Sequence, residues 1–296
     1  MKILISDAFD SSLPEKLAPF GSVTQDKGEL ARAEVVLIRS KTRCDREYLD
    51  AAPNLRLIIR GGVGLDNVDR EYAAEKGILV FNTAAASSVA VAELAFTHLL
   101  ALPNHVVRAH DSMKAGQWLK KELKRTELFG KTLVILGCGR IGTEVAKRAR
   151  AFGMEVLGYD ILPLESEYMT IYQDLETVIP RGDYFSLHLP ATPRTRGLVN
   201  RDLLARMKHG VYMSNTGRAA TVVEEDVAEA LRSGQLAGYA TDVWNSDPPA
   251  ASPLLEAPNT LLSPHLGAST RENLLRIGEI VVQLLEKYRQ GELRQN

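Results

Sequence analysis

Cysteine is scarce in this chain, and the two cysteines that occur lie far apart. Cys44 and Cys138 are the only thiols among 296 residues, and they form no CxxC pair. Neither a disulfide framework nor a cysteine-based zinc site is therefore expected, and we expect no metal. Such sparing use of cysteine is typical of a reducing compartment, so we expect a cytoplasmic protein.

An excess of charge of one sign is also absent. The 36 Lys and Arg residues nearly balance the 37 Asp and Glu residues, which leaves a formal net charge of -1. This balance argues against nucleic acid or an anionic membrane surface as the main partner. The N-terminal apolar run, residues 2–5, is too short for the core of a signal peptide. No stretch approaches the apolar length that spans a bilayer.

What is present is a globular composition with an alternating pattern. Hydrophobic residues make up 45% of the chain and charged residues 25%, and the length suits two domains. Short β-branched runs predict strands at residues 2–5, 35–38, 57–59, 78–81, 131–136, 155–159, 184–189, 211–214, 238–242 and 260–262. Apolar periodicity predicts helices at residues 14–17, 46–51, 69–76, 141–152 and 270–288, and one from a cap at Ser87 or Ser88 to about Leu102. The alternation predicts an α/β fold with parallel sheets covered on both faces.

The segment 105–127 interrupts this alternation. It is polar and contains the break Gly116-Gln117-Trp118, which predicts a surface excursion. Trp118 either anchors an interface with another chain or packs against its own domain.

A glycine-rich turn joins the expected strand 131–136 to the helix that follows it. Its sequence, Gly137-Cys138-Gly139-Arg140-Ile141-Gly142, fits the dinucleotide-binding pattern G-x-G-x-x-G. The first glycine makes the tight turn, the second lets a pyrophosphate approach the backbone, and the third lets helix and strand pack closely. The phosphates then lie at a helix N-terminus, where unpaired N–H groups favour negative charge. We interpret Cys138 as a small filler of this turn.

An acidic residue ends the next expected strand, as the dinucleotide pattern requires. The carboxylate of Asp160 can accept hydrogen bonds from the adenosine ribose hydroxyls and would repel a 2′-phosphate. No Arg or Lys occurs in residues 161–164. The sequence therefore favours NAD over NADP.

Several segments along nearly the whole chain match one known family. Three of them follow expected strands, at the edge where open α/β sheets bind ligands: residues 215–218, 242–248 and 263–267. With residues 60–69, 137–142, 189–195 and 264–270, they resemble the D-isomer-specific 2-hydroxyacid dehydrogenase family. The resemblance is strongest to its D-3-phosphoglycerate dehydrogenase branch.

This resemblance implies two doubly wound parallel-sheet domains, Rossmann-like or flavodoxin-like. An NAD-binding domain, residues 85–268, would be inserted into a substrate domain made of residues 1–84 and 269–296. Similar proteins are homodimers joined through the nucleotide domain, which makes the excursion at 105–127 the candidate interface. Longer relatives carry C-terminal regulatory domains that bind serine. The chain has no room for one after Tyr288, so we expect a short form without serine feedback through such a domain.

The resemblance also implies the catalytic roles. His265 matches the acid/base that takes the hydroxyl proton, and imidazole suits this work because histidine titrates near neutral pH. Asp247 matches the carboxylate that pairs with this histidine, although the family usually has glutamate there. Arg218 matches the arginine that binds the substrate carboxylate and polarises the reacting oxygen. The following Ala219-Ala220 replaces glycines, which would strain the loop if position 219 needed a positive φ.

The remaining site residues are implied in the same way. Asp242 matches a residue that faces the nicotinamide carboxamide, and Arg39 and Arg60 match basic positions near a substrate phosphate. The backbone of Gly62, Val63 and Gly64 matches the loop that binds the substrate carboxylate. Further cofactor contacts are expected at Arg140, Ile141, Pro190, Thr195, Thr216, His265 and Gly267.

The expected function is NAD-dependent oxidation of a D-2-hydroxy acid to the 2-keto acid by hydride transfer. The first choice of substrate is D-3-phosphoglycerate, which gives 3-phosphohydroxypyruvate in the first step of serine biosynthesis. The alternatives are a glyoxylate or hydroxypyruvate reductase and a D-lactate dehydrogenase. A non-catalytic NAD(H)-sensing regulator is the alternative from another class.

Overall fold

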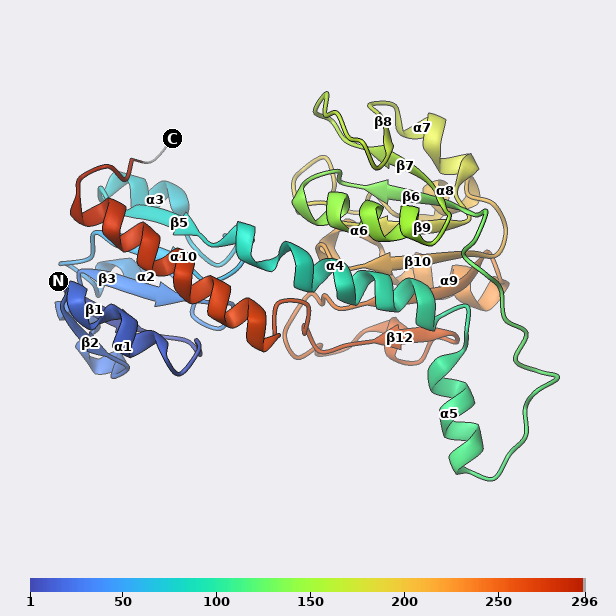
Figure 1. Ribbon diagram of the computed structural model, residues 1–296, viewed down its shortest axis with the longest axis horizontal. Helices are drawn as coiled ribbons and strands as arrows, with labels where there is room; N and C mark the ends of the chain where they lie inside the picture. The colour runs from blue at the N-terminus through green and yellow to red at the C-terminus, as the bar shows by residue number, and fades with distance from the viewer. Residues whose placement is uncertain (295–296) are drawn as a thin grey trace. The chain divides into compact units, whose positions relative to one another are not determined.

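The chain folds as two compact units. The computed structural model describes residues 1–294. The first unit contains residues 1–88 and the chain from Ala268 onward, and the second contains Val89–Gly267 (Figure 1). These limits lie within four residues of the boundaries placed at 84/85 and 268/269 from the sequence. The expected insertion of one α/β unit into another is therefore present.

A five-stranded parallel sheet forms the centre of the first unit, with the order β2-β1-β3-β4-β5. Its strands are β1 (Lys2–Ile5), β2 (Ser22–Thr24), β3 (Val35–Ile38), β4 (Leu57–Arg60) and β5 (Leu79–Asn82). Its helices are α1 (Leu13–Leu17), η1 (Ala18–Phe20), η2 (Lys27–Arg32), α2 (Arg46–Asp50), α3 (Arg70–Glu75) and α10 (Arg271–Arg289).

Both faces of this sheet are buried, which explains why its strands read as continuous apolar runs. All four residues of β3 are buried. Leu17 of α1 and Val281 of α10 pack on one face, whereas Leu49 of α2 and Ala73 of α3 pack on the other. The strand order reverses between β1 and β3, as in flavodoxin-like folds.

A seven-stranded parallel sheet forms the centre of the second unit, with the order β12-β11-β10-β9-β6-β7-β8. Its strands are β6 (Thr132–Leu136), β7 (Glu155–Tyr159), β8 (Thr170–Tyr172), β9 (Tyr184–Leu187), β10 (Val211–Asn215), β11 (Leu236–Thr241) and β12 (Thr260–Leu262). Its helical elements are α5 (Val106–Lys114), α6 (Arg140–Ala151), α7 (Leu175–Val178), η3 (Ile179–Arg181), α8 (Arg201–Ala205), η4 (Ala219–Thr221), α9 (Glu224–Ser233) and η5 (Pro253–Leu255).

The order of these strands is that of a Rossmann fold, and it reverses between β6 and β9. In open α/β sheets, ligands bind outside the carboxyl ends of the strands at such a reversal. The glycine turn follows β6, and His188 follows β9, so both lie at this point. The fold thus places the dinucleotide motif where the chain topology leaves space for a ligand.

The helix α4 (Ala84–Ala101) begins three or four residues earlier than the caps expected at Ser87 or Ser88. Asn82 lies just before this start, and its Oδ1 accepts a long hydrogen bond of 3.4 Å from the N–H of Ala84. The two serines are instead buried within the helix. The expectation that no stretch could span a bilayer was also wrong by length and composition. This 18-residue helix has a mean hydropathy of 1.5, but 56% of it is buried, and Phe96 and Leu99 pack in the core of the second unit.

The expected excursion includes the nine-residue helix α5, which the sequence pattern did not reveal. Figure 1 shows α5 and the segment after it extending away from the rest of the second unit. The side chain of Trp118 is 73% exposed, so the interpretation that it packs against its own domain was wrong. Other large apolar side chains are exposed in the same stretch, namely Val106, Val107 and Met113, and Phe129 is exposed just after it.

Candidate active site

The glycine turn has the geometry that its three glycines predict. Gly137 has a φ of 97°, and a Cβ placed on it would lie 2.9 Å from the carbonyl oxygen of His188. A Cβ on Gly142 would overlap the carbonyl oxygen of Gly137, so α6 and the turn approach each other too closely for a side chain. A Cβ on Gly139 would meet nothing within 4 Å. The turn is therefore tight on two sides and open at its middle glycine, which fits a pyrophosphate at the N-terminus of α6.

Asp160 is tied to the same turn. Its Oδ2 accepts a hydrogen bond of 2.9 Å from the N–H of Cys138, and its Oδ1 accepts one of 3.0 Å from the N–H of Leu162. The carboxylate therefore stands beside the glycine turn, as a ribose-binding acid must. The thiol of Cys138 is buried, and this burial raises its pKa to about 12, so it is not a reactive thiolate at neutral pH.

His188 connects β9 to the segment that follows β10. Its Nε2 lies 2.9 Å from Oγ of Ser186, and its Nδ1 lies 3.2 Å from Oγ1 of Thr216. Surrounding protein atoms lower the pKa of His188 to about 3, which keeps the ring neutral at physiological pH. Thr216, an expected cofactor contact, is thus held by a neutral histidine. Two further expected cofactor contacts, Pro190 and Thr195, lie in one turn. Oγ1 of Thr195 donates a hydrogen bond of 2.5 Å to the carbonyl of Pro190.

Three neighbouring strands bring the expected catalytic segments to one edge of the sheet. The last residues of β10, β11 and β12 are in register, since Asn215 pairs with Thr241 and Thr241 pairs with Leu262. The segments that carry Arg218, Asp247 and His265 follow these strands in turn. Residues separated by about 50 positions in sequence therefore leave the sheet side by side.

The turn before Arg218 is fixed by Asn215, which is fully buried. The side chain of Asn215 accepts from the N–H of Gly217 at 3.0 Å and donates to the carbonyl of Arg218 at 3.1 Å. The hydroxyl of Thr221 donates to the same carbonyl at 2.7 Å. Ala219 opens the short helix η4 without a positive φ, so alanine in place of glycine causes no backbone strain there. The guanidinium of Arg218 is half-buried and also donates to the carbonyl of Gly217.

His265 and Asp247 form the expected pair. Nδ1 of His265 lies 2.6 Å from Oδ2 of Asp247, so the aspartate reaches the ring although it is one methylene shorter than glutamate. The two side chains are 42% and 46% exposed. His265 has a φ of 56°, a left-handed conformation that non-glycine residues rarely adopt and that the surrounding loop must support. The pairing leaves Nε2 of the ring for a substrate.

Asp242 supports that loop. It is 2% exposed, and its Oδ1 accepts from the N–H of Leu266 at 2.7 Å and from Oγ of Ser263 at 2.6 Å. Its Oδ2 accepts from the N–H of Gly267 at 2.7 Å. These bonds hold the residues on both sides of His265, a role that the sequence did not reveal because the partners lie more than 20 residues away. The expected contact of Asp242 with the carboxamide stays a prediction.

In the first unit, the expected anion-binding residues follow the strands of the other sheet. Arg39 comes after β3, and its backbone N–H donates to Oδ2 of Asp7 at 2.6 Å. Arg60 ends β4, and its guanidinium covers Gly62, where a Cβ would overlap it. Gly62 has a φ of 145°, which only glycine adopts readily. Both arginines are partly buried rather than on the open surface.

The expected carboxylate loop offers two N–H groups rather than three. The N–H of Gly62 already donates to Oγ1 of Thr83 at 2.9 Å. Within residues 1–294 we find no partner for the N–H groups of Val63 and Gly64. The amide of Asn82 donates to the carbonyl of Val63 at 2.5 Å and so holds the loop against β5. Val63 and Gly64 are therefore the two positions of this loop from which an anion could accept a bond.

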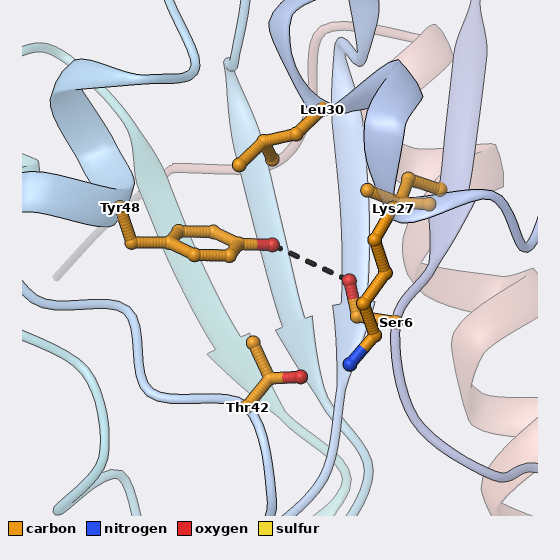
Figure 2. Close-up of a pocket in the computed structure, with 6 residues that line it drawn as sticks. Ser6, Lys27, Leu30, Thr42 and Tyr48 are labelled. Atoms are coloured by element: carbon orange, nitrogen blue, oxygen red, sulfur yellow. Dashed lines mark hydrogen bonds between the residues drawn. The ribbon is translucent and has the colours of Figure 1, made fainter.

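A small pocket beside β1 in the first unit is not a candidate substrate site. Figure 2 shows the hydroxyls of Ser6 and Tyr48 facing each other across it, 3.3 Å apart, with Lys27, Leu30 and Thr42 around them. Its volume is about 50 Å³, which is enough for a few water molecules because one water molecule needs about 10–15 Å³. A phosphorylated hydroxy acid does not fit in it. Among residues 1–294, no group of three His, Cys, Asp or Glu side chains could hold a metal ion.

A Rossmann sheet with an open glycine turn, a carboxylate beside that turn and a His–Asp pair at its carboxyl edge has the features of an NAD-dependent oxidoreductase. Comparison with known families gives the particular class. Residues 96–267, more than half of the chain, match the model described as "D-isomer specific 2-hydroxyacid dehydrogenase, NAD binding domain". The chain belongs to this family, and NAD is its cofactor.

Individual relatives agree on the family and differ in substrate. The chain is 38% identical to a D-3-phosphoglycerate dehydrogenase of Methanocaldococcus jannaschii over 100% of its own length, and it spans only 59% of that protein. It is 43% identical to a hydroxypyruvate reductase of Thermotoga maritima, covering 88% of this chain and 87% of that one. A crystal structure of D-lactate dehydrogenase from Aquifex aeolicus with NAD and lactic acid has a TM-score of 0.87, with 30% identity over 98% of this chain and 96% of that one.

Proposed function

We propose that this protein oxidises D-3-phosphoglycerate to 3-phosphohydroxypyruvate with NAD, or catalyses the reverse reduction. The observation that carries the dehydrogenase chemistry is the 2.6 Å contact between Nδ1 of His265 and Asp247. A histidine oriented by a carboxylate is the usual means of moving a hydroxyl proton. The particular substrate rests on the arginines of the first unit.

The residues of the second unit divide the work of oxidation. NAD, when bound at the glycine turn, would supply the acceptor for the hydride of the 2-carbon. Nε2 of His265 takes the proton from the 2-hydroxyl, and Asp247 stabilises the imidazolium that forms. The guanidinium of Arg218 binds the substrate carboxylate and polarises the reacting oxygen. In the reverse direction, His265 returns its proton to the oxygen of the keto acid.

Arg39 and Arg60 favour a phosphorylated substrate. Burial lowers the pKa of Arg39, although the charge of Asp7 opposes this change, so its guanidinium is partly shielded from solvent. The guanidinium of Arg60 lies against Gly62, beside the loop that offers the N–H groups of Val63 and Gly64. Two guanidinium groups can satisfy a phosphate through paired hydrogen bonds. The two arginines would contribute less to the binding of lactate or glyoxylate, because these acids carry no phosphate.

Hydroxypyruvate reduction is the second candidate, and a specific observation favours it. The hydroxypyruvate reductase is the relative whose own length this chain spans more fully, 87% against 59% for the phosphoglycerate dehydrogenase. A D-lactate dehydrogenase is the third candidate of the same chemical class. A regulator that binds NAD(H) without turnover is the candidate from a different class.

A substrate panel separates these candidates. The absorbance of NADH would be followed with D-3-phosphoglycerate, D-glycerate and D-lactate in oxidation, and with hydroxypyruvate and glyoxylate in reduction. We expect the highest kcat/KM with D-3-phosphoglycerate, and Arg60→Ala to raise the KM for it by about tenfold or more while changing the KM for D-lactate little. A preference for hydroxypyruvate that Arg60→Ala leaves unchanged would favour the reductase. Clear NADH binding without turnover of any acid would favour the regulator.

We further propose a homodimer, with the segment 105–127 as its interface. The exposed side chains of Val106, Met113 and Trp118 are apolar, and aromatic and methionine residues are enriched in such contacts. Light scattering of the wild type should give twice the chain mass, and Trp118→Ser should reduce it at low concentration. An unchanged mass after this substitution would place the interface elsewhere. A cytoplasmic location stays a prediction.

A further inference from the structure

The contact between His265 and Asp247 is not sufficient by itself to fix the two loops that carry these residues. Both side chains are nearly half exposed, and exposed polar pairs contribute little to structure because water screens them and both side chains lose freedom. A contact of 2.6 Å between two loops therefore depends on what holds their backbones. For the loop of His265, the three hydrogen bonds to Asp242 provide this support. The loop of Asp247 needs an equivalent.

Glu224 provides it. This residue is the first of α9 and is 8% exposed. Its Oε1 accepts a hydrogen bond of 3.0 Å from the side-chain amide of Asn245, and its Oε2 accepts one of 2.6 Å from the hydroxyl of Ser252. Asn245 lies two residues before Asp247, and Ser252 lies five residues after it. One buried carboxylate thus joins the two stems of the loop 245–252.

The position of Glu224 suits a fixed anchor. A carboxylate in the first turn of a helix is stabilised by the helix dipole, which offsets part of the cost of burying Glu224. Its two hydrogen bonds are charge-assisted, which makes them stronger than bonds between neutral groups. Ser252 also accepts from the N–H of Leu254 and so begins η5, which fixes the far stem of the loop. At the near stem, the indole of Trp244 donates to the carbonyl of Ser263, in the loop of His265.

We propose that Glu224 is a positioning residue for the dehydrogenase reaction: it fixes the loop 245–252 and thereby holds Asp247 against His265. This inference rests on the proposed dehydrogenase activity and deepens it. Glu224 touches neither member of the pair and acts only through the backbone between Asn245 and Ser252. Its removal should therefore disturb the reaction only while Asp247 is present to be positioned.

A double-mutant cycle tests this dependence. Glu224→Ala should lower kcat by about 10- to 100-fold, the loss expected when a catalytic group moves by about 1 Å. In the background of Asp247→Ala, the same substitution should change kcat by less than about twofold, because effects of residues that act as a unit are not additive. The pH profiles of kcat for the two single variants should coincide and differ from that of the wild type. The Kd for NADH should stay within about twofold of wild type in every variant.

Matched controls exclude a general loss of structure. Glu225 is exposed and follows Glu224 directly, so Glu225→Ala should behave as wild type. Asn245→Ala and Ser252→Ala each remove one of the two bonds and should give intermediate losses of kcat, which keeps the test open if Glu224→Ala does not fold. Thermal unfolding would be measured for each variant.

Two results would overturn the inference. One is wild-type kcat in Glu224→Ala, and the other is a full, additive loss when Glu224→Ala is combined with Asp247→Ala. Failure of the dehydrogenase proposal looks different, because the wild type itself would then turn over no acid of the panel. An active wild type with an additive cycle therefore refutes the positioning role alone.

Discussion

The buried histidine His98 should make the protein less stable in mild acid. His98 lies in α4, is 2% exposed, and its Nδ1 contacts Oγ of Ser214 at 3.1 Å. Burial lowers its pKa from 6.5 to about 4, although Asp242 opposes this change. The unfolded chain therefore takes up a proton near pH 6.5, whereas the folded protein takes it up only near pH 4. The contribution of neutral His98 to the stability of the folded protein is therefore fully present above pH 6.5, and it is lost as the pH falls toward 4.

The size of this effect follows from the pKa difference. At 1.36 kcal/mol per unit, the lowering from 6.5 to 4 corresponds to about 3 kcal/mol in total, of which about 2 kcal/mol is lost by pH 5. His98→Gln can keep a hydrogen bond to Ser214 but does not titrate. The variant should therefore lose about 2 kcal/mol less than the wild type between pH 7.5 and pH 5.

Urea unfolding at the two pH values measures this difference. His110 is exposed, and His110→Gln is the matched control that should leave the pH dependence unchanged. His188, whose pKa is also lowered, keeps its own contribution in all three proteins. Equal losses of stability in the wild type and in His98→Gln would show that burial does not hold His98 neutral.

Three further predictions concern the cofactor turn and the loop of His265. Gly142→Ala should lower both Tm and NADH affinity because its Cβ has no space, whereas Gly139→Ala should weaken NADH binding by about tenfold or more with Tm unchanged, as thermal unfolding and fluorescence titration would show. An unchanged affinity for NADH in Gly139→Ala would show that the pyrophosphate does not lie against this glycine. Asp160→Ala should raise the ratio of kcat/KM for NADP to that for NAD, because the repulsion of a 2′-phosphate is lost; a constant ratio would contradict its assigned role. Asp242→Asn should lower kcat by about 10- to 100-fold, since an amide cannot accept from all three donors, and wild-type kcat would show that the loop needs no such support.

Local patterns were sufficient to predict the sheets and the glycine turn. Strands buried on both faces, such as β3, carry continuous apolar runs, and the motif from Gly137 to Gly142 lies between a strand and a helix as its chemistry requires. The short edge strands β2 and β8 were not predicted, because three residues with little burial carry no clear pattern. The start of α4 was placed too late because Ser87 and Ser88 resemble caps when their burial is unknown.

The site was predictable in its residue types but not in its supports. A sequence with a His, an Arg and an Asp after three strands indicates the chemistry, and the register of β10, β11 and β12 brings them to one edge. The carboxylates of Asp242 and Glu224 act on partners 21–28 residues away, through hydrogen bonds that no spacing rule reveals. The conformations of Ala219 and His265 also depend on tertiary contacts, so the question of strain at 219 could be answered only from the structure.

Turnover by His265→Ala, with NADH binding measured on the same protein, tests the central claim most directly. We expect kcat to fall by about 10²- to 10⁴-fold with the best acid of the panel, because the proton of the 2-hydroxyl loses its acceptor. The Kd for NADH should stay within about twofold of wild type. A kcat close to that of the wild type, or a loss of NADH affinity as large as the loss of turnover, would contradict the assignment of this histidine as the acid/base.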